Sequence, residues 1–362
     1  MYNNWVTFYR KVKNQMEILG LTSRELEETL SSEFNVERWR SRQIFDWIYK
    51  KGTLSFSSMT NLSKPLRSLL ENFFEFPSMK IIRKSESVDG TCKYLISLED
   101  SNSVEAVVIP HINRRTFCIS SQVGCPVGCA FCWTGRMGFI RNLRVSEIIG
   151  QILLVQEDLK QRIGNVVFMG MGEPFLNFDN VMKAVYIMND KDGLAIGARR
   201  ITLSTVGIPE KIIKFSRFPL QVRLAVSLHA PTSEKRKKIV PLDIQYPLEK
   251  VLAASREYVI NTNRRITIEY VLIKGFNESL KDADNLSKIL KGLRCNVNLI
   301  PVNENPAGFE KPDDRQVSAF AEELKRNGIE AVVRIERGTD IRGACGQLKN
   351  EKQVLITETQ GK

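Results

Sequence analysis

From about Phe117 to about Asn327 the sequence alternates short apolar runs with longer amphipathic segments, and this alternation limits the folds open to the chain. Six such pairs in succession predict an α/β fold with a parallel sheet, either open or closed into a barrel. In folds of this kind, ligands bind at the carboxyl ends of the strands. The expected strands are residues 117–121, 165–169, 200–205, 222–228, 266–272 and 295–300, and the expected helices are 146–159, 179–189, 209–216, 247–260, 279–291 and 314–327.

Two further regions precede this predicted core. Thr22 and Glu25 form a capping-box pattern, and an apolar stripe from Trp39 to Tyr49 ends at Gly52, which predicts a small helical domain. After it, Asp89-Gly90 is typical of a hairpin turn between β-type runs. The expected organisation is a helical domain over residues 1–75, a β-hairpin linker extension over 76–112, a core over 113–350 and a tail over 351–362.

The charge of the chain favours an anionic partner. Lys and Arg number 53 against 41 Asp and Glu, a formal net charge of +12, and such a surface attracts RNA, DNA or anionic lipid. A solubilising surface explains the same charge equally well. Two basic clusters could form a binding face or merely solvated helix faces: Arg38, Arg40, Arg42, Lys50 and Lys51, and the run Lys235, Arg236, Lys237 and Lys238.

The compartment is expected to be the cytoplasm. The chain contains no run of 18 apolar residues and no apolar segment near Met1 that would mark a secretory signal, so no membrane association is expected. Seven cysteines, an odd number, argue against a secreted disulfide scaffold and favour metal or redox chemistry.

The segment Cys125-Pro-Val-Gly-Cys129-Ala-Phe-Cys132 follows the first predicted strand of the core. Three thiolates at this spacing can hold three irons of a [4Fe–4S] cube. The fourth iron would keep an open site for the amino and carboxylate groups of S-adenosylmethionine (SAM), whose reductive cleavage gives a 5′-deoxyadenosyl radical. A structural zinc site or a redox dithiol is the alternative, although zinc normally takes four protein ligands.

A second segment, Gly170-Met171-Gly172-Glu173-Pro174, follows the second predicted strand and supports the same chemistry. Its glycines allow a close approach of the backbone to a ligand, and Glu173 could accept hydrogen bonds from the ammonium of SAM. Phe131, between the last two cysteines, suits packing against adenine. Gly-Glu-Pro is also an ordinary turn, so its position after a strand carries the argument.

With these motifs the sequence resembles the dual-specificity 23S ribosomal RNA and tRNA adenine-C2 methyltransferases of the radical SAM superfamily. The resemblance runs from about residue 100 to residue 348 and fits the first 75 residues more loosely. It implies a partial (β/α)6 barrel of the radical SAM type. The matching segments are Phe117–Cys125, Arg141–Arg144, Phe168–Pro174, Ser227–His229, Val297–Pro301 and Ala344–Leu348.

The resemblance implies roles for individual residues. Cys345 would accept a methyl group from one SAM, and a radical made from a second SAM would activate it. Cys118 would then release the methylated base by forming a transient disulfide, and Glu105 would take the proton from carbon 2. Contacts to SAM would come from Gly172, Glu173, Ser204, Ser227, Leu228, His229 and Asn303.

Each of these residues also has a structural explanation. Cys118 and Cys345 could be buried thiols, which is the role we expect for Cys92 and Cys295. Glu105 could face solvent from an alternating strand, and the serines could simply end strands. Two departures from the family pattern are Trp133, where smaller residues are common, and Arg342, where an acidic residue is frequent.

The resemblance also implies the partners. The substrates would be 23S rRNA at the peptidyl transferase centre, before full ribosome assembly, and the adenine 3′ of the anticodon in tRNA. A monomeric enzyme would receive electrons from a flavodoxin or ferredoxin. The alternatives are an adenine-C8 methyltransferase that gives antibiotic resistance, a non-catalytic RNA-binding factor with a structural cluster, and a zinc-bearing RNA-binding module.

Overall fold

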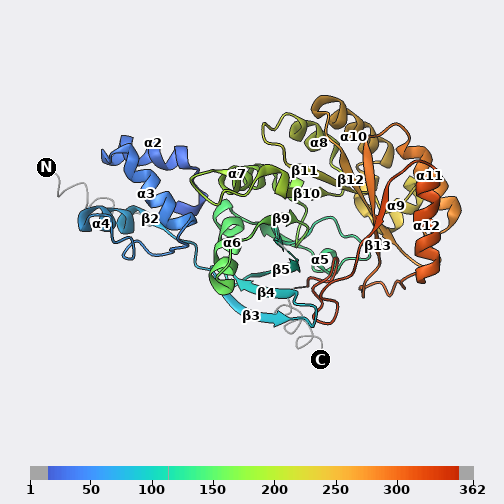
Figure 1. Ribbon diagram of the computed structural model, residues 1–362, viewed down its shortest axis with the longest axis horizontal. Helices are drawn as coiled ribbons and strands as arrows, with labels where there is room; N and C mark the ends of the chain where they lie inside the picture. Colours follow the sequence, from blue (N-terminus) through green and yellow to red (C-terminus); the bar gives the residue numbers. More distant parts are fainter. Residues whose placement is uncertain (1–14, 113, 350–362) are drawn as a thin grey trace.

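The computed structural model describes residues 15–112 and 114–349 of the chain (Figure 1). Its N-terminal part consists of the 3-10 turn η1 (Ile18–Gly20) and helices α2 (Ser23–Phe34), α3 (Arg38–Tyr49) and α4 (Lys64–Phe73), with strands β1 (Met16–Glu17) and β2 (Phe74–Glu75) paired in parallel. The capping box is confirmed, because the amide of Glu25 donates to Thr22 and the amide of Thr22 donates to Glu25.

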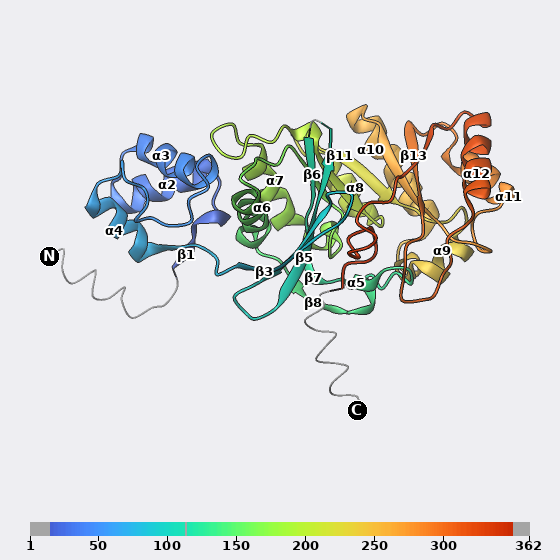
Figure 2. The same cartoon turned by 60° about the horizontal axis from the view of Figure 1, so that its bottom comes forward.

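This N-terminal part packs against the outside of the core at one end of the molecule (Figures 1 and 2). Glu25 of α2 forms a 2.8 Å ion pair with Lys183 of helix α7 (Phe178–Asn189), and Ser146 of helix α6 (Val145–Leu159) donates to Glu17 at 2.5 Å. Ile44 and Ile48 of α3 are buried in the same hydrophobic cluster as the core helices. The two parts therefore share one hydrophobic interior.

A ten-stranded sheet with the order β14-β13-β12-β11-β10-β9-β6-β5-β4-β3 organises the rest of the chain. From β6 to β14 every pairing is parallel, whereas β3 to β6 form an antiparallel meander. The strands are β3 (Lys80–Glu86), β4 (Cys92–Ser97), β5 (Ser103–His111), β6 (Arg114–Cys118), β9 (Asn165–Phe168), β10 (Ile201–Thr205), β11 (Arg223–Ser227), β12 (Ile266–Leu272), β13 (Cys295–Pro301) and β14 (Ala331–Val333).

The expected alternation is confirmed, and it gives the predicted parallel sheet of a partial barrel. Strand β12 shows why, since almost all of its residues are buried on both faces, as parallel strands covered by helices require. The covering helices are α6, α7, α8 (Pro209–Ser216), α9 (Ser233–Ile239), α10 (Leu248–Thr262), α11 (Leu280–Leu290) and α12 (Asp314–Arg326). No helix in the described ranges has the length and apolarity needed to span a bilayer.

Residues 80–111, expected as a linker extension, are continuous with the core sheet. Val107 of β5 pairs with Cys118 of β6, and Cys118 pairs in turn with Val167 of β9. The hairpin expected at Asp89-Gly90 joins β3 to β4, and Gly90 has the positive φ of +78° that favours glycine. The meander is thus one edge of the sheet that carries the candidate site.

Candidate active site

The loop that carries Cys125, Cys129 and Cys132 is fixed by backbone contacts. It lies between strand β7 (Gln122–Gly124) and helix α5 (Trp133–Arg136), and strand β8 (Phe139–Asn142) pairs with β7. The amide of Cys125 donates to the carbonyl of Gly138 at 2.8 Å. Gly124 has φ +73°, and a Cβ there would lie 2.0 Å from that carbonyl, so the turn requires glycine.

The three cysteines of this loop could together hold an iron–sulfur cluster. Each lines the same cavity, and burial raises the pKa of Cys125 to about 12, so the free thiol stays protonated until a metal displaces the proton. In a [4Fe–4S] cube each cysteine binds a different iron, so three cysteines leave one iron open to a ligand in the cavity.

The cavity encloses about 160 Å³ at the carboxyl ends of β9 to β13, where the fold class predicts a ligand site. The cluster cysteines line it together with most of the residues expected to contact SAM, namely Gly172, Glu173, Ser204, Ser227, His229 and Asn303. Leu228 differs, because its side chain is fully buried in the hydrophobic core. Its backbone carbonyl accepts a hydrogen bond from Arg236 at 3.0 Å.

Glu173 is held rigidly at the wall of this cavity. Its carboxylate accepts hydrogen bonds from the amides of Val206 at 2.8 Å and Phe175 at 2.9 Å, and its own amide donates to Gln122. Burial raises the pKa of Glu173 to about 7, although these hydrogen bonds oppose the rise. A cation placed beside this carboxylate would favour its ionised form.

His229 presents a defined tautomer to the cavity. The amide of Val271 donates to its Nδ1 at 3.1 Å, which leaves the proton on Nε2. Burial lowers the pKa of His229 to about 3, so the ring is neutral at physiological pH. The backbone has φ +62°, and Asn277 stabilises this strained conformation by donating to the His229 carbonyl at 2.7 Å. The ring of Phe131 lies edge-on to the imidazole of His229, with 4.9 Å between the two ring centres.

The segment after β14 brings Cys345 to the rim of the cavity, where it lies beside α5 (Figures 1 and 2). The amide of Trp133 donates to the carbonyl of Gly346 at 2.8 Å, and the hydroxyl of Thr134 donates to that of Leu348 at 2.7 Å. Asn303, expected to contact SAM, donates to the carbonyl of Cys345 at 3.1 Å. The cysteine farthest along the chain therefore lies next to the cluster loop.

Two carboxylates fasten this Cys345 loop (residues 338–349) to the β3–β4 turn. Asp340 accepts hydrogen bonds from the Ser87 hydroxyl at 2.6 Å and from the Val88 amide at 3.3 Å. Asp89 accepts one from the amide of Gly338 at 3.1 Å. Gly338 has φ +64°, and a Cβ there would lie 2.8 Å from Thr91, so the contact depends on glycine.

Cys118 and Glu105 lie on neighbouring strands under the Cys345 loop. Burial, and then the charge of Cys345, raise the pKa of Cys118 to about 12, against the opposing charge of Arg334. Glu105 is 1% exposed, and its Oε2 accepts a hydrogen bond from the amide of Lys349 at 3.0 Å. All seven cysteines of the chain are free thiols.

Arg334 also belongs to this site, although the sequence analysis did not identify it. It follows β14 and lines the cavity, and the charges of Cys345, Glu269 and Cys118 raise its pKa. The positive charge of Arg334 therefore interacts with the thiols of both Cys345 and Cys118. A cation at the carboxyl end of a strand is the sequence feature that could have pointed to Arg334. That strand, β14 (Ala331–Val333), was not among the expected strands.

The two departures from the family pattern have local explanations. Arg342 adopts φ +51° and forms an ion pair with Glu304 at 3.2 Å on the protein surface. Trp133 begins α5, and the ammonium of Lys349 lies 5.0 Å from the centre of its ring. Both residues thus contact the segments that hold the Cys345 loop.

Half of the run Lys235–Lys238, considered above as a binding face, is structural. Arg236 is 1% exposed and forms a 2.8 Å ion pair with the fully buried Asp243. Lys235 pairs with Asp282 at 2.6 Å. Lys237 and Lys238 are exposed, and Lys238 forms only a surface pair with Glu234 at 3.4 Å. The positive charge that this run offers to a partner therefore comes from its last two lysines.

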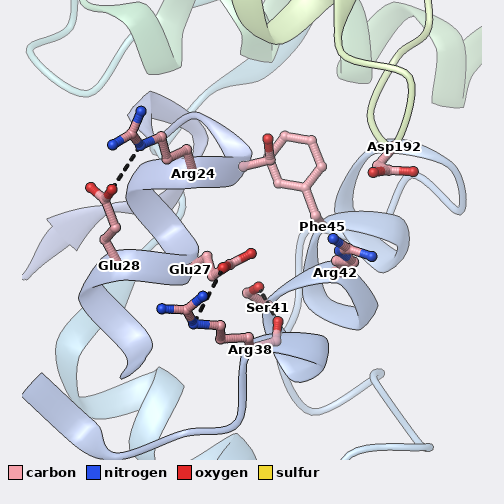
Figure 3. Close-up of a pocket in the computed structure, with 9 residues that line it drawn as sticks. Arg24, Glu27, Glu28, Arg38, Ser41, Arg42, Phe45 and Asp192 are labelled. Atoms are coloured by element: carbon pink, nitrogen blue, oxygen red, sulfur yellow. Dashed lines mark hydrogen bonds and ion pairs between the residues drawn. The ribbon is translucent and has the colours of Figure 1, made fainter. Parts of the chain in front are cut away.

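The cluster on α3 has more exposed cations. Arg40 stacks on Trp39, with 3.7 Å between its guanidinium carbon and the ring centre, and Lys51 lies 3.5 Å above Trp47. A second cavity of about 450 Å³ lies between α2, α3 and Asp192 (Figure 3). The cavity is lined by three arginines and three acidic residues, namely Arg24, Arg38, Arg42, Glu27, Glu28 and Asp192. Because these charges balance, the cavity favours neither an anionic nor a cationic ligand.

Comparison with protein-family models gives two matches. Residues 16–76 match the model described as "Ribosomal RNA large subunit methyltransferase N-terminal domain". Residues 119–286 match the model described as "Radical SAM superfamily". The two matches cover the helical region before the meander and most of the parallel sheet.

Comparison with individual proteins covers nearly the whole chain. It is 51% identical over 338 residues to the "Probable dual-specificity RNA methyltransferase RlmN" of Thermotoga neapolitana, covering 93% of this chain and 98% of the relative. The protein of the same description from Petrotoga mobilis is 50% identical, with 92% and 97% covered. The crystal structure of a radical SAM methyltransferase from Sphaerobacter thermophilus superimposes with a TM-score of 0.89 at 43% identity, covering 92% of this chain and 99% of that one.

Proposed function

The chain belongs to the RlmN family of radical SAM dual-specificity RNA methyltransferases, and on this basis we propose that it methylates carbon 2 of adenine in two RNAs. The substrates are the 23S rRNA adenine at the peptidyl transferase centre, before ribosome assembly is complete, and the adenine 3′ of the anticodon in tRNA. The observation that supports this best is the convergence of the cluster cysteines, Glu173, His229 and Cys345 on one cavity.

Membership of the radical SAM superfamily implies a [4Fe–4S] cluster and SAM. Cys125, Cys129 and Cys132 hold the cluster in this proposal. The cluster supplies the electron that cleaves SAM to a 5′-deoxyadenosyl radical. Two SAM molecules are used per turnover, one as methyl donor and one as radical source. A flavodoxin or ferredoxin is the proposed electron donor.

The cavity residues bind and orient SAM. Glu173 accepts hydrogen bonds from its ammonium group, and the proton on Nε2 makes His229 a hydrogen-bond donor. Phe131 offers an apolar face for the adenine ring. Gly172, Ser204, Ser227 and Asn303 complete the contacts, with the backbone of Leu228 behind them.

Cys345 is the methyl carrier. Its sulfur attacks the methyl carbon of the first SAM and releases S-adenosylhomocysteine. The 5′-deoxyadenosyl radical from the second SAM takes a hydrogen atom from that methyl group and becomes 5′-deoxyadenosine. The carbon radical left on Cys345 adds to carbon 2 of adenine, and the unpaired electron then lies in the ring. This route suits an electron-poor carbon that is not a nucleophile.

Glu105 and Cys118 complete the reaction. Glu105 takes the proton from carbon 2 of the adduct, and the unpaired electron would pass to a one-electron acceptor such as the iron–sulfur cluster, which restores the aromatic ring. The sulfur of Cys118 then attacks the sulfur of Cys345 and forms a disulfide. The bond from Cys345 to the methylene carbon breaks, that carbon takes up a proton and leaves as the methyl group of the base, and an external thiol reopens the disulfide. Arg334 supports this role, because it places a positive charge beside two thiols that must react as thiolates.

RNA binding is assigned to the helical region before residue 76, together with the basic face of α3. Arg40, which is half-buried, and Lys51, which is exposed, lie above tryptophan rings, an arrangement suited to phosphate and base contacts. The target base must leave its helical stack to reach the cavity. We place the enzyme in the cytoplasm as a monomer, where its RNA substrates and an electron donor meet.

Two cysteine variants test the mechanism. Cys345→Ala should carry no protein-bound methyl group and form no methyladenine. Cys118→Ala should accept the methyl group and add to the base, then stall as a protein–RNA adduct seen as a gel band that nuclease trims. Full turnover by Cys118→Ala, or an adduct with Cys345→Ala, contradicts these roles. Mass spectrometry of digested RNA identifies the methylated carbon.

A further inference from the structure

A buried lysine contacts the proposed proton acceptor. Lys93 of β4 is 4% exposed, and its ammonium lies 3.5 Å from Oε1 of Glu105, which is itself 1% exposed. Burying two charges is unfavourable compared with an apolar pair of the same size. The fold alone therefore does not account for a charged pair at this position.

The sheet register places this pair beside the resolving thiol. Lys93 pairs with Val107 across β4 and β5, and Val107 pairs with Cys118 across β5 and β6. Residues paired across antiparallel strands point to the same face, and so do residues two apart on one strand. Lys93, Glu105 and Cys118 consequently emerge from one face of the sheet.

The Cys345 loop covers that face. The amide of Lys349 donates to Oε2 of Glu105 at 3.0 Å, whereas the ammonium of Lys93 lies nearer Oε1. The contact with Lys93 and the contact with Lys349 therefore involve different oxygens of the carboxylate. Oε2 is the oxygen in contact with the end of the Cys345 loop.

We propose that Lys93 is a positioning residue for the proton transfer, which rests on the function proposed above. The ammonium compensates the charge of Glu105 and holds Oε1, so that Oε2 points toward the substrate. When the adduct forms, Oε2 exchanges the Lys349 amide for the hydrogen on carbon 2. The proton moves to Oε2, and the electron pair of the C–H bond stays in the purine ring. The unpaired electron of the adduct would pass to a one-electron acceptor, the iron–sulfur cluster of the proposed function, and Lys93 keeps its protons.

The test compares Lys93→Met, Lys93→Arg, Glu105→Gln and the double variant Lys93→Met/Glu105→Gln as full-length, cluster-reconstituted protein. Deoxyadenosine, methylated Cys345, protein–RNA adduct and methyladenine are measured with one rRNA fragment. Loss of a general base slows proton transfer roughly 100-fold or more, and we expect Lys93→Met to slow methyladenine release about tenfold. Adduct should accumulate while deoxyadenosine and methylated Cys345 form normally.

The other variants distinguish the effect of the positive charge of Lys93 from the effect of its exact position. Lys93→Arg keeps the charge and should release more product than Lys93→Met. The double variant should be no slower than Glu105→Gln, because both residues act in one step. Lys84→Met is the matched control, since Lys84 on neighbouring β3 pairs with Asp158 at 2.8 Å and lies outside the cavity.

Three results would overturn the proposal: product release by Lys93→Met at the wild-type rate, multiplied effects in the double variant, or equal slowing in Lys84→Met. If Lys93→Met takes up no iron, the double variant decides. If the double variant takes up iron again, the result supports the pairing of the two charges. If the double variant also takes up no iron, Lys93 has a purely structural role and the proposal fails. Wild-type turnover by Glu105→Gln would refute the base itself, whereas a wild-type chain that forms no methyladenine would refute the proposed function.

Discussion

Replacing Arg236 by methionine tests whether the buried ion pair behind β11 supports the SAM side of the cavity. Its guanidinium lies 2.8 Å from Asp243, and the two side chains are 1% and 0% exposed. It also donates to the carbonyl of Leu228 at 3.0 Å and to that of Ser227 at 3.3 Å. The guanidinium donates as well to the carbonyls of Val206 and Tyr246, so the variant leaves a buried carboxylate without its cation and four carbonyls without this donor.

The expected cost follows from that burial. Removing one partner of a buried ion pair costs about 3 to 5 kcal/mol, so we expect the free energy of unfolding to fall by about 4 kcal/mol. That corresponds to roughly a thousandfold change in the folding equilibrium constant. Arg236→Met/Asp243→Leu removes both charges and should recover at least about 2 kcal/mol of the loss.

Urea unfolding of the iron-free protein measures these differences. SAM binding by the reconstituted protein then reports whether Ser227 and His229 have moved. Lys238→Met is the matched control, because Lys238 lies on the same helix in an exposed pair with Glu234 and should matter little. A cost below about 1 kcal/mol for Arg236→Met, or a double variant no more stable than the single one, would refute the reasoning.

Three further predictions concern the cluster, the cavity and the RNA. Anaerobically purified protein should be brown with close to four irons per chain, as a cube requires, and Cys125→Ala/Cys129→Ala/Cys132→Ala should lose iron and colour; iron analysis decides this. Burial raises the pKa of Glu173 to about 7, and an ammonium ligand needs the ionised form, so SAM affinity should rise roughly tenfold from pH 6 to pH 8. Calorimetry with Glu173→Gln should show weaker binding without that rise, and an unchanged slope would assign the titration to another group. Affinity for an rRNA fragment should fall steeply with salt, and Arg40→Ala/Lys51→Ala should reduce the slope in filter binding; an unchanged slope places the RNA elsewhere.

Local patterns were sufficient to predict the frame of the molecule. The buried runs around Val166, Leu224 and Ile268 predicted parallel strands, because apolar residues on both faces suit only a covered sheet. The capping box at Thr22 and the turn at Gly90 were predicted from side-chain chemistry within a few residues. The predictions for the cluster cysteines and Glu173 were possible because their spacing is itself local, and the structure brings these residues to one cavity.

Features that depend on tertiary pairing could not be predicted in this way. Strand β14 was missed because its three residues are too few to show a period, and Arg334 after it was missed in consequence. Lys93 lies within a strand, where a charged residue usually faces solvent. Only the register between β4 and β5 shows that it faces Glu105.

The fastening of the Cys345 loop separates the timing of the reaction from its chemistry. Asp89 and Asp340 join the start of the loop to the β3–β4 turn, while other residues line the cavity. A substitution at either carboxylate therefore removes a hydrogen bond that holds the Cys345 loop without changing any residue of the cavity wall. The strength with which the loop is held and the composition of the pocket can thus vary independently in this fold.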